Sequence, residues 1–145
     1  MPPAAEMQLR SVGHIETPWR RLEDCPRNIE PDGPVCRLVL APEYAPALCG
    51  LQPGQTILVL YWLDRADRLR LHQASRITGE EGGVFALRTP NRPNPIGAGV
   101  VRIERCSGNS IEVRGLDCLD GTALLDIKPA AKVEQPPSPG KKGSR

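Results

Sequence analysis

The segment from Arg88 to Gly99 carries the densest set of hydrogen-bonding side chains on a stiff backbone. It reads Arg-Thr-Pro-Asn-Arg-Pro-Asn-Pro-Ile-Gly-Ala-Gly, and three prolines within six residues fix φ and remove backbone donors. A rigid loop with arginine and asparagine side chains loses little entropy when it binds a ligand. A plain connection between two strands can have the same composition. We expect a binding loop rather than a strand or helix, with Arg92 and Asn94 as candidate substrate contacts.

A second polar segment, Leu116 to Pro129, places three carboxylates among apolar residues. Asp117, Asp120 and Asp126 can hold ribose hydroxyls or face a cationic ligand. The dipeptide Asp120-Gly121 is a turn signal, which by itself is equally typical of a plain hairpin. Loops elsewhere hold Pro26-Arg27-Asn28 and Asp64-Arg65, and these indicate little on their own.

Several common functional classes are disfavoured. The sequence has no CxxC pair, and its two histidines are far apart, so we expect no metal site. Arg102 occupies the third position that a Gly-x-Gly-x-x-Gly dinucleotide fingerprint beginning at Gly97 would need. The odd number of scattered cysteines is a poor disulfide framework, and we expect small buried side chains instead. These are Cys25, Cys36, Cys49, Cys106 and Cys118.

Short apolar and alternating runs predict a mainly β protein. The continuous run Thr56–Leu63 is typical of a strand buried on both faces. Gly108-Asn109 predicts a hairpin turn, and Pro42–Leu48 is the best helix candidate. We therefore expect a single-domain, closed β-barrel-like sheet with a short helix and long loops. The predicted strands are Val35–Leu40, Thr56–Leu63, Arg68–His72, Val84–Arg88, Gly99–Arg105, Ser110–Arg114 and Leu124–Ile127.

The length of the chain and the distribution of its charged residues indicate how it is organised. A chain of 145 residues favours one domain, which we place at residues 9–131, with flexible tails at 1–8 and 134–145. No apolar run is long enough to span a bilayer, and no secretion signal is evident, so we expect no membrane partner and a cytoplasmic protein. Residues 1–131 hold 15 basic and 16 acidic side chains, so this part is not a strongly basic nucleic-acid binder.

Two long motifs occur in order: Arg92-Pro93-Asn94-Pro95-Ile96-Gly97, preceded by Arg88, and Asp117-x-x-Asp120-Gly121-Thr122-x-x-x-Asp126-Ile127-Lys128-Pro129. With the opening Val12-Gly13-His14-Ile15-Glu16-Thr17-Pro18, they make the chain resemble the tRNA N6-threonylcarbamoyladenosine methyltransferase family, also called TsaA-like or TrmO-like, over roughly residues 9–130. The resemblance implies a β-barrel, S-adenosylmethionine as the cofactor, tRNA as a partner, and a homodimer with cofactor sites close to the subunit contact.

The resemblance also suggests which positions contact the cofactor. Four departures from the family pattern occur: Asn28 for glutamine, Asp64-Arg65 for a His-Gln pair, Ala123 for proline and Ala130 for tyrosine. The implied cofactor-binding residues are Pro26, Arg27, Asn28, Asp64, Arg65, Arg88, Ala98, Asp120, Gly121, Thr122 and Ala123.

The implied reaction is methylation of N6 of threonylcarbamoyladenosine, next to the tRNA anticodon. This nitrogen belongs to a urea-like group and is a poor nucleophile, so a base that removes its proton would help. The candidates for that base are Asp64, Asp126 and His72.

Particular cofactor contacts follow as hypotheses. Arg27 or Arg88 can clamp the carboxylate of the cofactor. Asp120 can accept from ribose hydroxyls, and the N–H groups of Gly121 and Thr122 can meet the adenine edge.

Aromatic side chains give a further expectation. Trp19 and Tyr44 are the candidates for stacking on RNA bases. Core packing is the expected role of Tyr61, Trp62 and Phe85.

Two other functions stay open. One is a methyltransferase with a different acceptor. The other is a protein that binds S-adenosylmethionine for sensing or interaction, without catalysis. The near-neutral charge of residues 1–131 favours the second, because tRNA binding draws on basic surface.

Overall fold

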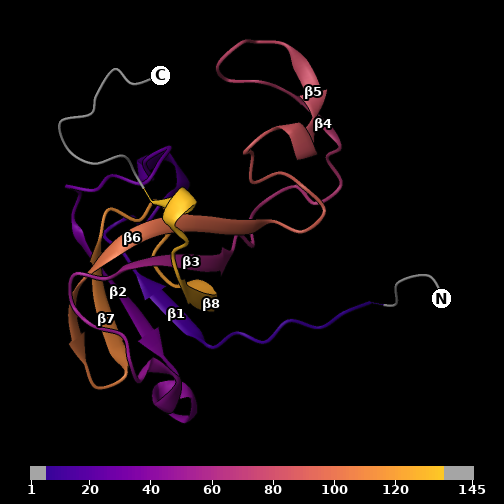
Figure 1. Cartoon of the computed structure of the whole chain (residues 1–145). Helices are drawn as coiled ribbons and strands as arrows, with labels where there is room; N and C mark the ends of the chain where they lie inside the picture. Colours follow the sequence, from indigo (N-terminus) through magenta and orange to yellow (C-terminus); the bar gives the residue numbers. More distant parts are fainter. Residues whose placement is uncertain (1–5, 136–145) are drawn as a thin grey trace.

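Six antiparallel strands close into a barrel in a computed structural model that describes residues 6–135 (Figure 1). Closure leaves no strand edge unpaired, which removes the hazard of exposed backbone donors and acceptors. The predicted mainly β, barrel-like fold is thus confirmed. In order around the barrel the strands are β1 (Gly13–Glu16), β2 (Val35–Leu40), β7 (Ser110–Arg114), β6 (Ile96–Ser107), β3 (Thr56–Trp62) and β8 (Thr122–Pro129).

Side-chain alternation along each strand fills the barrel interior. In β3, Ile57, Val59 and Tyr61 are buried, whereas the residues between them are half-buried on the outer surface. The expectation of two fully buried faces is therefore wrong for this strand, because its outer face is only partly covered. The remaining core side chains come from the other strands and the loop before β8, and include Ile15, Leu38, Ile103, Ile111, Val113, Leu116 and Leu124.

The predicted turn at Gly108-Asn109 and the predicted helix at Pro42–Leu48 are both present. Gly108 and Asn109 join β6 to β7, with Gly108 at a φ of 60°. Helix η2 (Pro42–Leu48) has the predicted bounds but is a 3₁₀ helix with Pro46 inside it, a position where proline disfavours an α-helix. Two further 3₁₀ helices flank the barrel, η1 (Leu22–Asp24) and η4 (Lys132–Glu134).

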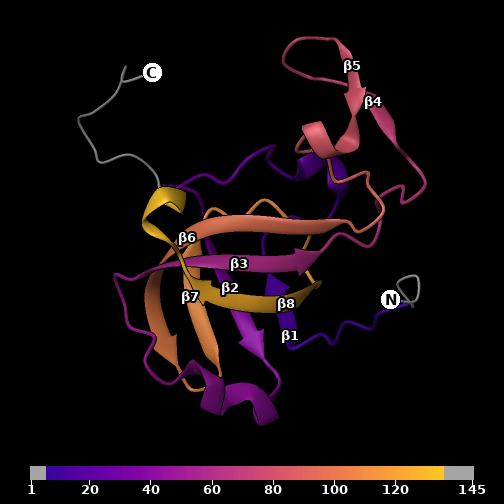
Figure 2. The same cartoon turned by 45° about the vertical axis from the view of Figure 1, so that its right-hand side comes forward.

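Residues 64–95, which we call the arm, leave the barrel after β3 and return at β6 (Figure 2). The arm holds a two-stranded sheet of β4 (His72–Ala74) and β5 (Glu81–Gly83), followed by the 3₁₀ helix η3 (Val84–Ala86). The predicted strands at 68–72 and 84–88 are wrong, apart from His72. Alternation indicates a strand only where a sheet is present to bury its apolar face, and this segment projects away from the core.

Apolar side chains of the arm consequently remain exposed. Leu69 is 90% exposed, Ile77 is 94% exposed and Phe85 is 81% exposed. The expected core role of Phe85 is therefore wrong.

Hydrogen bonds hold the arm's proline-rich return segment. The Gln73 side-chain oxygen accepts from the Thr89 hydroxyl at 3.0 Å and from the Asn91 amide at 3.2 Å. The guanidinium of Arg92 donates to the carbonyls of Leu87 and Thr89, at 3.0 and 2.9 Å. These contacts support the rigid loop that the three prolines predict.

The loop ends earlier than predicted. Strand β6 starts at Ile96, so residues 96–99 are strand rather than loop. Backbone N–H donors resume after Pro95, and Gly97 leaves room for the Tyr61 ring, which a Cβ at position 97 would overlap.

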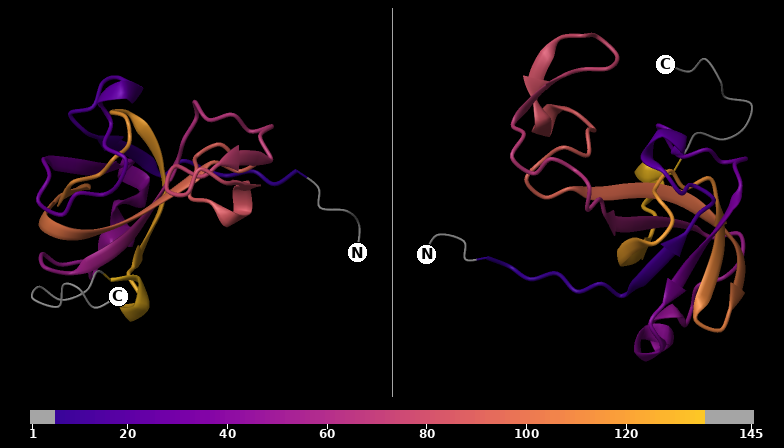
Figure 3. Two further views of the ribbon diagram at one scale, coloured as in Figure 1. Left: turned by 90° about the horizontal axis from the view of Figure 1, so that it is seen from above. Right: turned by 180° about the vertical axis from the view of Figure 1, so that it is seen from behind.

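The loop of residues 17–34 lies at the same end of the barrel as the base of the arm, and η2 lies at the opposite end (Figure 3). Glu30 N donates to Gly115 O at 2.9 Å, and Gly115 N donates to Pro34 O at 2.9 Å. Ile29 packs over Gly99, where a Cβ would come within 2.8 Å of its side chain. These contacts cap the barrel and fix the chain that leads to Asp117.

Most of the predicted tails, at residues 1–5 and 136–145, lies outside the described residues. Within residues 6–135, none of the helices has the length and hydrophobicity to span a lipid bilayer.

Candidate functional site

The end of β3 and the start of β8 form a polar pocket, which we call the β3–β8 pocket, with a volume of about 170 Å³. These strands are antiparallel neighbours with Trp62 opposite Ala123, so the residues after β3 and before β8 meet at one barrel end. The structure therefore brings together two segments that are far apart in the sequence and that the resemblance selects. The lining residues are Trp62, Asp64, Arg65, Leu119, Asp120, Gly121, Thr122 and Ala123.

Asp120 is fixed by the N-terminal loop. Its Oδ1 accepts from Thr17 N at 3.0 Å, its Oδ2 lies 3.8 Å from Arg20 Nε, and its own N donates to Trp19 O at 2.8 Å. The side chain remains about one third exposed, so it can still accept from a ligand. Asp120 is thus a preorganised carboxylate at the mouth of the pocket.

The turn after Asp120 offers fewer donors than predicted. Gly121, at a φ of 86°, donates its N–H to Ile15 O at 2.8 Å. Thr122 N and Oγ1 both donate to Leu119 O, at 3.2 and 2.6 Å. The hypothesis that these two N–H groups meet an adenine edge is therefore wrong for this structure, because both are already used within the protein.

Trp62 has a role that the sequence did not indicate. Its indole is half-buried and lines the β3–β8 pocket, whereas we expected it in the core. The guanidinium of Arg68 lies 5.1 Å from the centre of the ring, a cation–π distance. Successive side chains of β3 point to opposite faces, so the ring of Trp62 lies outside the barrel while that of Tyr61 lies inside.

A second polar contact joins Tyr61 and Asp117. Tyr61 is buried, and its hydroxyl donates to Asp117 Oδ1 at 2.8 Å. Burial raises the pKa of both groups, and the positive charge of Arg88 partly opposes this shift in each pKa. Arg88 itself is exposed on the arm. The loop before β8 therefore holds a half-buried carboxylate that is bonded to a buried tyrosine.

The loop holding Pro26, Arg27 and Asn28 also contains Cys25. The pKa of the Cys25 thiol is raised first by burial and then by the negative charge of Asp117. Pro26 is half-buried, and Arg27 and Asn28 are exposed.

The remaining predicted residues are not gathered at the pocket. Of the three candidate bases, only Asp64 lines it; His72 lies in β4 of the arm. Asp126 and Ala98 both pair with Leu60 and are exposed on the outer surface of the barrel. Among the predicted substrate contacts, Arg92 is occupied by arm carbonyls, and Asn94 is exposed with its carbonyl accepting from Ile96 N.

The two candidates for base stacking lie apart. The Trp19 indole donates to Leu116 O at 3.0 Å, beside the loop that leads to Asp117. Tyr44 packs against the core from η2, at the other end of the barrel.

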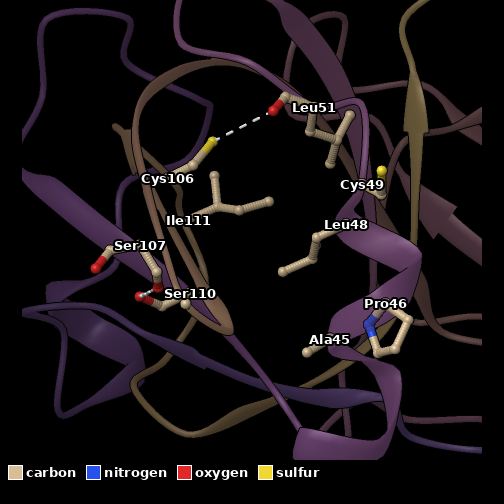
Figure 4. A pocket seen from close by; sticks show the side chains of 10 residues that line it. Ala45, Pro46, Leu48, Cys49, Leu51, Cys106, Ser107, Ser110 and Ile111 are labelled. Atoms are coloured by element: carbon tan, nitrogen blue, oxygen red, sulfur yellow. Dashed lines mark hydrogen bonds between the residues drawn. The ribbon is translucent and has the colours of Figure 1, made fainter.

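A larger hollow of about 310 Å³ lies between η2 and the β6–β7 hairpin (Figure 4). Leu48, Leu51 and Ile111 line it together with the thiols of Cys49 and Cys106. It contains none of the predicted site residues. We therefore place the candidate site at the smaller β3–β8 pocket, where the predicted residues meet. Among residues 6–135, no cluster of His, Cys, Asp and Glu side chains is arranged to hold a metal ion.

The cysteines divide by exposure, which corrects the expectation that they are buried. Cys36 and Cys118 are buried, but Cys49 and Cys106 are exposed.

At pH 8 we expect a colorimetric thiol reagent to modify Cys49 and Cys106 rapidly. Cys118 should stay protected, because burial raises its pKa to about 12 and leaves little thiolate. Unfolding in guanidinium should expose all five thiols, and rapid native-state labelling of Cys36 or Cys118 would contradict the burial.

The fold and site define a class: a closed, six-stranded antiparallel barrel whose loop residues meet in a polar pocket at one end. Residues 14–133 match the family described as tRNA-methyltransferase O N-terminal domain, and the chain belongs to this family.

Individual relatives agree with this assignment. The probable S-adenosyl-L-methionine-binding protein VirR of Rhizobium radiobacter is 45% identical over 142 residues, covering 98% of this chain and 81% of VirR. A crystal structure of TrmO from Pseudomonas aeruginosa superposes with a TM-score of 0.72 at 27% identity. That match covers 96% of this chain but 62% of the TrmO chain, so this protein spans somewhat less than two thirds of TrmO. The mouse tRNA (adenine(37)-N6)-methyltransferase is 35% identical over 91 residues, 61% of this chain and 21% of the mouse protein.

Proposed function

We propose that the chain binds S-adenosylmethionine in the β3–β8 pocket and transfers its methyl group to N6 of threonylcarbamoyladenosine in tRNA, in the cytoplasm. The observation that carries this proposal is the meeting of Asp64-Arg65 with Asp120–Ala123 around one pocket. Both segments stand at positions that the family resemblance selects for the cofactor.

The residues present fit the chemistry of this cofactor. Asp64 and Asp120 give the pocket negative charge, which suits a sulfonium and can accept from ribose hydroxyls. Arg65 suits a carboxylate, and the Trp62 indole offers an apolar face to a ring. The pocket volume of about 170 Å³ is below the roughly 300 Å³ of an ordinary small-molecule site, so it can hold only part of the cofactor. Arg88 and the Pro26–Asn28 loop, which the resemblance selects, are the residues we propose for the rest.

When bound, the cofactor supplies an electrophilic methyl group. Transfer by direct displacement depends mainly on alignment of the reacting atoms. Asp120 contributes to that alignment at little entropic cost, because its carboxylate accepts from Thr17 N and its backbone N donates to Trp19 O. Asp64 is the predicted base that stands at the pocket, and it is the residue we propose to accept the proton of the acceptor nitrogen.

Charge distribution supports tRNA as the acceptor. The arm holds six arginines and four carboxylates, whereas residues 1–63 and 96–131 together hold nine basic and twelve acidic side chains. Within residues 1–131 the arm is thus the positively charged part and the remainder is acidic, and arginine suits phosphate. The names of the TrmO and mouse relatives point to the same acceptor class.

The test combines cofactor binding with methyl transfer. Purified protein and labelled S-adenosylmethionine are mixed with tRNA that carries or lacks the threonylcarbamoyl group, and nucleosides are resolved by mass spectrometry. We expect a mass gain of one methyl only on the modified nucleoside. Methylation of unmodified tRNA or of another molecule would contradict threonylcarbamoyladenosine as the acceptor.

A second function is favoured by the names of relatives such as VirR, which describe binding and no reaction. In that function the protein senses S-adenosylmethionine without turnover. Tight cofactor binding with no methyl transfer to either tRNA would select it.

We also propose that the chain forms a homodimer, as the resemblance implies, and that the arm makes the subunit contact. The exposed side chains of Leu69, Ile77 and Phe85 support this, because such apolar side chains on a projecting segment are typical of a contact surface. Replacing Ile77 and Phe85 together by Glu should weaken self-association at least about ten-fold, since two charges would be desolvated at the interface. Light scattering after gel filtration should then report a monomer.

The matched control is Ala47→Glu, which adds a charge on η2 at the opposite end of the barrel. It should leave the dimer intact. An unchanged dimer in the Ile77→Glu, Phe85→Glu variant would place the subunit contact elsewhere.

A further inference from the structure

The outer surface of the barrel has a charged half and an apolar half. On β1, β2 and β7 the outward side chains include charged groups that form ion pairs. Arg37 Nη1 lies 3.1 Å from Glu16 Oε1, and Arg114 Nε lies 2.7 Å from Glu104 Oε1. A charged outer surface is expected where one face of an antiparallel sheet meets water. The outward positions of β3 and β6 depart from this pattern.

Five outward side chains of β3 and β6 form one apolar surface, which we call the β3–β6 face. Leu58 is paired with Val100, and Leu60 is paired with Ala98. Ile96 follows at the end of the face that lies toward the arm. The residues between these positions point into the barrel. Ile96 is 41% exposed, and none of the five side chains belongs to the packed core.

Charged side chains surround the β3–β6 face, but no further element covers it. Among the helices and strands of residues 6–135, β3 and β6 pack substantially only against each other and their sheet neighbours β7 and β8. Arg102 follows the face along β6, and Asp126 and Lys128 flank it on β8. An apolar surface with a charged rim is typical of a protein–protein contact.

The arm of the same chain carries apolar side chains that match this face. Leu69, Ile77 and Phe85 are 90%, 94% and 81% exposed, so their own barrel does not bury them. The arm projects away from the barrel to which it belongs (Figures 1 and 2). Its six arginines and four carboxylates make it positive, whereas the nine basic and twelve acidic side chains of the rest of residues 1–131 make that part negative. The arm of one copy is therefore complementary in charge to the barrel of another.

We infer that the arm of one protomer packs its apolar side chains on the β3–β6 face of a second copy, whose own arm packs on the face of the first. The inference rests on the proposed homodimer and names the surface that the arm contacts. Two complementary patches on one chain give a closed dimer when a two-fold axis relates the copies, because each contact then occurs twice. A contact between the two arms alone would leave both β3–β6 faces open to water.

Making the face polar tests this contact by gel filtration with light scattering. Leu58→Glu combined with Val100→Lys places opposite charges at directly paired positions, and Lys128 is the neighbour of position 58 on β8. These cross-strand ion pairs should keep the barrel folded, which the melting temperature checks. We expect self-association to weaken at least about ten-fold, because the introduced charges would be desolvated at the contact.

The matched control for the face variant is Val35→Glu, which adds a charge opposite Arg114 on the charged half of the barrel. It should leave the dimer intact. A dimer that Leu58→Glu with Val100→Lys does not weaken would overturn the inference, leave the homodimer standing and assign the face to another partner.

Photocross-linking locates the contact without changing the face. The photoreactive residue para-benzoylphenylalanine replaces Phe85, and dimers of one isotope-labelled and one unlabelled chain are irradiated. Mass spectrometry should find intermolecular cross-links to residues 56–62 or 96–102. Cross-links to the arm of the partner subunit instead would overturn the inference. A wild-type chain that is monomeric at micromolar concentration would overturn the proposed homodimer and the inference with it.

Discussion

Gly115→Ala is expected to lower the free energy of unfolding by about 3–5 kcal/mol, among the largest effects of any single methyl addition in this chain. Gly115 has a φ of 79°, which costs a residue with a Cβ about 1–2 kcal/mol. The added Cβ would also overlap the backbone carbonyl of Glu30, so the two loops must separate. That movement breaks the bond from Glu30 N to Gly115 O and displaces Asp117, two residues further along.

Urea denaturation followed by fluorescence measures this loss. The control is Gly108→Ala, which has a similar φ of 60° but open space around the new Cβ, and should cost only about 1 kcal/mol. Equal losses in the two variants would show that backbone conformation alone matters and that the contact with Glu30 is unimportant.

Asp120→Asn is expected to weaken S-adenosylmethionine binding about ten-fold while changing the free energy of unfolding by less than about 1 kcal/mol. The asparagine oxygen can still accept from Thr17 N, so the loop contact survives. The lost negative charge removes the charge-assisted bond that we propose to a ribose hydroxyl, and it removes attraction for the sulfonium. Calorimetric titration and thermal denaturation of the same sample measure both quantities.

Asp32→Asn provides the control, because it removes one negative charge from an exposed loop position. If Asp120→Asn and Asp32→Asn bind the cofactor equally well, the β3–β8 pocket is not where this charge acts. A large loss of stability in Asp120→Asn would instead make the residue mainly a loop anchor.

The barrel was predictable from sequence because its strands obey a local rule. Alternation in β2 buries every second residue, and the bounds of both β2 and β7 match the prediction. The arm was not predictable by the same rule. Leu69 and Leu71 alternate with arginines, but no sheet lies beneath them, and a pattern of hydrophobicity does not tell what the chain packs against.

The candidate site was predictable in part. The resemblance selected both Asp64-Arg65 and Asp120–Ala123, and strand pairing brings them together. Periodicity did not reveal Trp62 at the pocket, since a continuous apolar run hides which face is outward. The Tyr61–Asp117 bond joins residues 56 positions apart and depends on closure of the barrel. Such contacts follow from the three-dimensional register of strands and not from local composition.

The alternation of Tyr61 and Trp62 along β3 makes the register of this strand a determinant of the proposed ligand site. One neighbour anchors Asp117 from inside the barrel, and the other lines the pocket from outside. A single-residue insertion or deletion upstream in β3 would exchange the two rings between the faces and dismantle both arrangements at once. Length changes in the arm turn at residues 75–80 alter no barrel register, so insertions should be tolerated there. We therefore expect insertions and deletions to be tolerated in the arm turn but not in β3, where they would exchange the positions of Tyr61 and Trp62.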